Sequence, residues 1–173
     1  MNKGVLGFLS STRSLIGFLI ATLAIFAGFY FVLQAIDGPL LDMMMSGDRA
    51  IVRLNQLSDD QSAVHFWATV TLDVAYPLAY GGLLIGLLSR LAWRWRWLLI
   101  LVPVIAALAD YAENLVQAMA LSGYASEILH AKDIVTPLKS GALILSLVLC
   151  VLLGAGRLIF RSPNKDDKED MQI

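Results

Sequence analysis

Four polar side chains lie close together in an apolar part of the sequence. The segment ADYAENLVQ, residues 109–117, carries Asp110, Glu113, Asn114 and Gln117 between runs of Leu, Val, Ile and Ala. A helix advances about 100° per residue, so positions i, i+3, i+4 and i+7 share one face. A charge buried without a partner costs on the order of several kcal/mol unless it is neutralised. The sequence therefore predicts that these side chains point toward partners on other segments.

A second polar face is predicted in the preceding apolar segment. Its side chains follow helical spacings of four, four, three and four residues: His65, Thr69, Asp73, Tyr76 and Tyr80. Pro77, four residues after Asp73, has no backbone N–H, so the carbonyl of Asp73 loses its helical donor and the helix is expected to kink there. We therefore expect a free backbone acceptor beside this carboxylate.

A third segment supplies a cation. Lys139 follows Thr136 near the start of the last apolar run, and both lie on the same helical side as Ser146 and Cys150. Three carboxyl groups, those of Asp73, Asp110 and Glu113, then face one lysine. Either at least one carboxyl is protonated, or a cation or cationic ligand binds, or water reaches the site. All three alternatives are typical of functional sites.

Four apolar segments must position these side chains. The sequence is 58% hydrophobic and 16% charged, with a mean hydropathy of +0.70, which indicates a membrane protein. Spanning a bilayer takes about 20 residues, and the segments that are long enough are 14–36, 63–88, 97–121 and 136–158. The predicted fold class is all-α, a polytopic bundle of four transmembrane helices that forms one domain. The first segment exceeds the apolar core of a signal peptide, about 7 to 15 residues, so we expect it to be kept as an anchor.

The basic residues predict how the bundle is oriented. Nine of the thirteen Lys and Arg residues lie at the two ends of the chain and in the loop between the second and third helices. The positive-inside rule then makes both termini cytoplasmic. In this orientation Asp73, Asp110 and Glu113 all lie about 12 to 16 Å below the outer ends of their helices. The small size and short loops favour a bacterial inner membrane.

The segments outside the four helices have their own signals. Residues 37–62 mix Leu and Met with charges, which predicts an interfacial helix. Residues 162–173 carry dense mixed charge and few apolar side chains, which predicts a disordered tail. The Trp and Arg residues of segment 89–97, SRLAWRWRW, are typical of a membrane interface, so membrane lipids are expected partners. The net charge of −1 gives no basic excess for nucleic acid.

Small residues predict where helices approach each other closely. Gly17, Ala21, Ala24 and Gly28 share one face of the first helix, and Gly82 and Gly86 lie opposite the polar face of the second. Such faces admit a neighbouring backbone, either within the chain or in a homo-oligomer.

These residues are compatible with three functions. The first is a site in the outer half of the bilayer that binds a proton, a cation or a polar small ligand, including a role in transport. The second is an intramembrane enzyme in which Asp73, Asp110 and Glu113 divide acid and base roles on a lipid-like substrate. The third is a polar network that fixes helix register in a scaffold or interaction protein.

The ligand-binding prediction covers the polar side chains near these carboxyls. They are Asn114, Lys139, Tyr76, Tyr80, Gln117 and His65. No metal site is predicted, because the two histidines, His65 and His130, do not form a helical His-x-x-x-His pair. The sequence identifies no cofactor.

Overall fold

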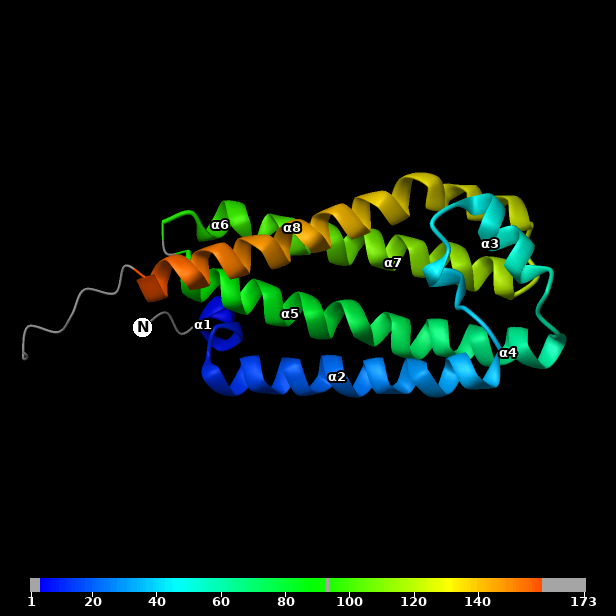
Figure 1. Ribbon diagram of the computed structural model, residues 1–173, viewed down its shortest axis with the longest axis horizontal. Coiled ribbons are helices and arrows are strands. Elements are labelled where there is room, and N and C mark those ends of the chain that lie inside the picture. Colours follow the sequence, from blue (N-terminus) through cyan, green and yellow to red (C-terminus); the bar gives the residue numbers. More distant parts are fainter. Residues whose placement is uncertain (1–3, 93, 160–173) are drawn as a thin grey trace, which may run out of the picture.

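The computed structural model describes residues 4–92 and 94–159. It is 85% helical and contains no strand among these residues. Four helical segments lie side by side, and each is long and apolar enough to cross a membrane (Figure 1). The predicted all-helical architecture with four such helices is therefore confirmed. The predicted tail, 162–173, lies outside the described residues.

The four segments are built from eight of the labelled elements. The first segment is α2 (Thr12–Ala35). The second is continuous through α4 (Asp59–Ala68), the π-helical turn η2 (Thr69–Asp73) and α5 (Val74–Leu91). The third joins α6 (Arg96–Leu99) to α7 (Leu101–Leu121), and the fourth joins η3 (Ser126–Ala131) to α8 (Lys132–Ile159). A short α1 (Val5–Leu9) precedes them.

Two of these segments begin at least one helical turn earlier than predicted. The second begins at Asp59 because Ser58 and Gln61 form a capping box: Ser58 Oγ accepts from the Gln61 backbone N–H, and Gln61 Oε1 accepts from that of Ser58. The helix α8 begins at Lys132, one turn before the apolar run. Hydropathy shows where a helix becomes apolar, which can be later than the residue at which the helix starts. A helix with a polar first turn therefore starts earlier than hydropathy predicts. That turn brings Lys132 onto the helix.

The loop between the first two segments is folded over one end of the bundle. It contains η1 (Leu41–Met43) and α3 (Gly47–Leu54), so a helix occurs in the predicted range 37–62. Leu41 and Ala50 pack there against Ala120 of α7 and Leu129 of η3. The described ends of the chain, at α1 and at the end of α8, lie at the opposite end of the bundle from α3 (Figure 1).

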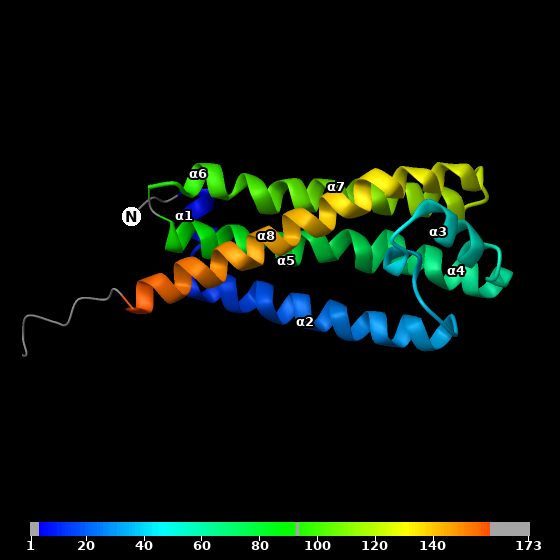
Figure 2. The ribbon, with the colours of Figure 1, turned by 45° about the horizontal axis from the view of Figure 1, so that its top comes forward.

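Glycines allow α2 to approach the second segment closely. A Cβ at Gly82 would lie 2.6 Å from the ring of Phe18, and one at Gly28 would lie 3.2 Å from the side chain of Leu72. Side chains of one segment thus occupy the space left by glycines of the other, as predicted for Gly82. The helix α8 packs mainly on α7 and α5 and runs obliquely to the other long helices (Figure 2).

Candidate functional site

Glu113 lies between two lysines of α8. Lys132 Nζ donates to Glu113 Oε1, and Thr136 Oγ1 donates to the same oxygen at 2.6 Å. Lys139 Nζ lies 2.5 Å from the other oxygen, Oε2, as an ion pair without hydrogen-bond geometry. The Lys132 and Glu113 side chains are both 0% exposed. This pair is therefore fully removed from solvent, and the charge of each side chain is compensated by that of the other.

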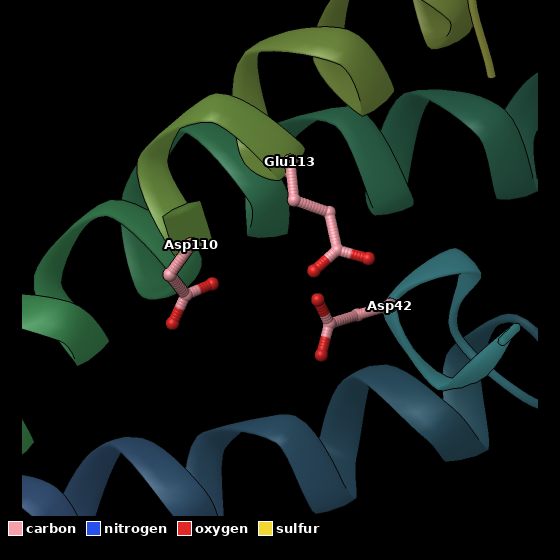
Figure 3. Close-up of side chains that lie close together, drawn as sticks. All are labelled: Asp42, Asp110 and Glu113. Atoms are coloured by element: carbon pink, nitrogen blue, oxygen red, sulfur yellow. The ribbon is translucent and has the colours of Figure 1, made fainter. Parts of the chain in front are cut away.

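Lys139 joins three carboxylates. Its Nζ lies 2.6 Å from Asp42 Oδ1 and 3.4 Å from Asp110 Oδ1, in addition to its contact with Glu113. Figure 3 shows Asp42 approaching from the loop toward Glu113, with Asp110 one turn away on α7. Burial alone would raise the pKa of the Asp42 carboxyl, but Lys139, Lys132 and the Gln117 hydrogen bond together outweigh burial and hold this pKa below its usual value of 3.8.

The same three carboxylates have the spacing of a metal site. One oxygen from each of Asp42, Asp110 and Glu113 lies within 4.8 Å of the other two. However, the Lys139 ammonium is within 3.4 Å of all three groups. Because this ammonium already supplies a positive charge among the carboxylates, we interpret the set as an ion-pair cluster.

Asp110 and Asp73 have different surroundings. Tyr80 donates to Asp110 Oδ2 at 3.0 Å, and Lys139 donates to its Oδ1, so both oxygens of Asp110 are engaged. Asp73 is only 6% exposed, and its Oδ2 has no hydrogen-bond partner among the described residues. Its backbone carbonyl does have one, since Asn114 Nδ2 donates to it at 2.8 Å. The predicted free backbone acceptor is thus present and is filled by the neighbouring polar face.

A pocket of about 400 Å³ adjoins these acids. Its polar side is formed by Asp42, Asp73, Asp110 and Lys139. Its other lining residues are apolar or aromatic, and half of them come from α2: Phe26, Phe29, Tyr30, Leu33, Leu40, Met43, Tyr76 and Leu143. The pocket therefore has the form of an apolar chamber with a charged wall.

Charge in the site does not balance within the described residues. Four carboxyl groups, those of Asp42, Asp73, Asp110 and Glu113, face two ammonium groups, those of Lys132 and Lys139.

No known protein family, curated protein or solved structure matches this chain. Its function must therefore be argued from the site itself.

Most of the predicted site residues meet in this region. Asp73, Asp110, Tyr76 and Lys139 line the pocket, while Glu113, Tyr80 and Asn114 hold its wall through the contacts described above. Gln117 lies one layer further out, where its Nε2 donates to Asp42 Oδ1 at 3.5 Å.

His65 lies apart from the pocket. The backbone N–H of Leu41 donates to His65 Nε2 at 2.8 Å, and His65 Nδ1 lies 3.2 Å from Thr69 Oγ1. Both ring nitrogens are thus engaged, and the side chain is fully buried. The contact holds η1, and therefore Asp42, against the second helical segment. His65 positions the loop and does not line the ligand space.

Two residues of the site, Lys132 and Asp42, are not predicted from the sequence. With them, the site has four carboxyls and two lysines, which corrects the expected three carboxyls and one lysine. Lys132 precedes Thr136 by four residues and Lys139 by seven, so continuing the helical spacing outward would have found it. Asp42 has no such signal, because it stands in a loop and reaches the site only through the folding of η1.

Proposed function

We propose that this chain is a multi-pass membrane protein whose pocket binds a small amphiphilic cation in the outer half of the bilayer. The distribution of Lys and Arg supports an orientation with both termini in the cytoplasm. The pocket, which is near the end of the bundle that carries α3, then faces the outer leaflet. We propose the inner membrane of a bacterium as its location.

The observation that carries this proposal is the position of the Asp73 carboxyl. This carboxyl is buried, lines the pocket, and has an oxygen without a partner among the described residues. A carboxylate in such a place is stabilised by a nearby positive charge, since burial otherwise disfavours its charged form. Because Lys132 and Lys139 already contact the other acids, a bound cation would supply the positive charge that Asp73 lacks.

The lining of the pocket supports a ligand with an apolar body. Phe26 and Tyr30 are 67% and 59% exposed, and both stand on α2, a helix apolar enough to span the membrane. In a membrane, the exposed faces of these two residues would put the rim of the pocket at the surface in contact with lipid. An amphiphile can enter sideways from the bilayer, with its chain along α2 and its head group toward Asp73.

A purely structural network explains only part of the site. Glu113 Oε1 accepts hydrogen bonds from Lys132 and Thr136, as groups that fix helix register do. Asp73 differs, because one of its oxygens is left unpaired beside a cavity. A network built only for packing would have no reason to keep both the cavity and the unpaired acid.

An enzyme is the second candidate, and one observation favours it. Asp73 and Asp110 face the same pocket in different surroundings, as the acid and base of a catalytic pair do. Native mass spectrometry of protein incubated with membrane lipid distinguishes the candidates. A lipid product that requires Asp73 would favour catalysis, while an unchanged bound amphiphile and its flux in liposomes would favour binding and transport.

Matched probes test the binding proposal. Decylammonium, decanol and decyl sulfate share an apolar chain and differ in head-group charge. At pH 7 in lipid nanodiscs, decylammonium should raise the Tm of the protein and the other two should not, because a ligand bound only by the folded state stabilises it. Asp73→Asn should lose most of this rise, while Glu127→Gln, which changes an exposed acid on η3, should keep it. Equal shifts with all three probes, or an unchanged shift in Asp73→Asn, would overturn the proposal.

A further inference from the structure

Aromatic residues line the same pocket as Asp73. Phe26, Phe29 and Tyr30 of α2 and Tyr76 of α5 all line the pocket. The rings of Phe29 and Tyr76 meet edge to face with centroids 5.8 Å apart, so the two helices are joined by an aromatic contact at the pocket wall. Aromatic faces attract cations, most of all cations that carry little water.

Three carboxylate oxygens of the pocket already accept hydrogen bonds. Both oxygens of Asp110 already accept hydrogen bonds, from Tyr80 and Lys139. Asp42 Oδ1 accepts from Lys139 and from Gln117. A primary ammonium loses water from three N–H donors when it is buried and needs an acceptor for each. Asp73 Oδ2, which has no partner among the described residues, can serve only part of that need.

We propose that the bound head group is a quaternary ammonium, whose methyl groups pack against Tyr76 and Phe29 and whose charge faces Asp73. Such a head group has no N–H to satisfy, so it gains the attraction of the carboxylate and of the rings without needing acceptors. This inference rests on the proposed function, because it names the chemical class of cation that the pocket takes.

The experiment compares two cations that differ only in methylation. The dissociation constants of decyltrimethylammonium and decylammonium are measured with the full chain in nanodiscs at pH 7. We expect the quaternary probe to bind about tenfold more tightly. Tyr76→Leu should weaken the quaternary probe by about tenfold and leave decylammonium within about twofold. Tyr76→Phe keeps the ring and should keep the preference, and Tyr124→Leu, at a tyrosine that is 60% exposed outside the pocket lining, is the matched control.

Each outcome separates this inference from the proposed function. Equal binding of the two probes, or tighter binding of decylammonium, would overturn the quaternary head group and leave a cation site in place. Loss of the preference in Tyr76→Phe would overturn the role of the ring. Binding of neither cation would overturn both proposals.

Discussion

Asn114 of α7 donates a hydrogen bond of 2.8 Å from its Nδ2 to the backbone carbonyl of Asp73. This is the carbonyl that would accept from residue 77 in an unbroken helix, and Pro77 has no N–H to give. The π-helical turn η2 ends at Asp73 itself. The side chain of Asn114 thus supplies the hydrogen bond that the Asp73 carbonyl lacks within its own helix, and the carboxyl of the same Asp73 faces the pocket.

The first prediction concerns this hydrogen bond. Asn114→Ala should lower the free energy of unfolding by about 1 to 3 kcal/mol, because it leaves a buried carbonyl without a donor. In a Pro77→Ala background the restored N–H can take the place of Asn114, so the same substitution should cost less. Denaturant unfolding of wild type, the two single variants and the double variant in detergent gives the coupling free energy between Asn114 and Pro77. Identical costs in the two backgrounds would show that Pro77 does not create the need for Asn114.

The second prediction concerns the buried pair on α7 and α8. Lys132→Met should destabilise the protein by about 3 to 5 kcal/mol, because it leaves Glu113 charged and buried with less compensation. Adding Glu113→Gln should recover part of that loss. Lys132→Met combined with Glu127→Gln is the control, since Glu127 lies at the exposed surface of η3. Strictly additive effects of Lys132→Met and Glu113→Gln would contradict the pairing.

The sequence predicted the helices and the polar faces for identifiable reasons. Hydropathy and length predict four helices, because a bilayer excludes unpaired backbone groups. Helical spacing predicts that Asp110, Glu113 and Asn114 share a face and that Asp73 and Tyr80 share another, and the contacts of Tyr80 and Asn114 show that these faces meet. Periodicity depends only on the sequence of one segment, so it predicts which residues share a helix face without knowledge of the neighbouring helices.

The remainder of the site depends on tertiary contacts. Asp42 reaches Lys139 because His65 holds η1 and Gln117 bonds the aspartate directly. No pattern along the loop encodes those contacts. Lys132 was overlooked for a different reason: it lies before the apolar run, although it is one helical turn from Thr136. The pocket also depends on where α2 stands relative to α8, which hydropathy does not specify.

The third prediction concerns pH. The folded-state pKa of Asp42 lies below its usual value of 3.8, because Lys139, Lys132 and the Gln117 hydrogen bond together outweigh the effect of burial. Its stabilising contribution is therefore complete above about pH 4 to 5 and is lost as the pH falls through the lower folded value. Asp42→Asn should lower the Tm at pH 7, and the difference from wild type should shrink below about pH 3.8. A difference that grows toward acid would contradict the ion pair.

The fourth prediction concerns orientation. In a Cys150→Ser background, single cysteines at Gln56 and Tyr124, both exposed at the α3 end, should react with an impermeant thiol reagent from outside intact cells. A cysteine at Trp95, which is 67% exposed in the loop before α6, should react only after the membrane is opened. The opposite pattern would reverse the orientation and put the pocket in the inner leaflet.

The position of the bound cation tests the central claim most directly. Decylammonium and decyltrimethylammonium probes, each with a diazirine beside the nitrogen, are irradiated with the protein in nanodiscs, and the adducts are mapped by mass spectrometry. We predict adducts on the pocket residues Asp42, Asp73 and Tyr76 that disappear with excess unlabelled cation and are strongly reduced in Asp73→Asn. Adducts confined to exposed apolar side chains outside the pocket, such as Leu108 and Val151, which are 63% and 68% exposed, and unchanged in Asp73→Asn, would contradict a cation site in this pocket.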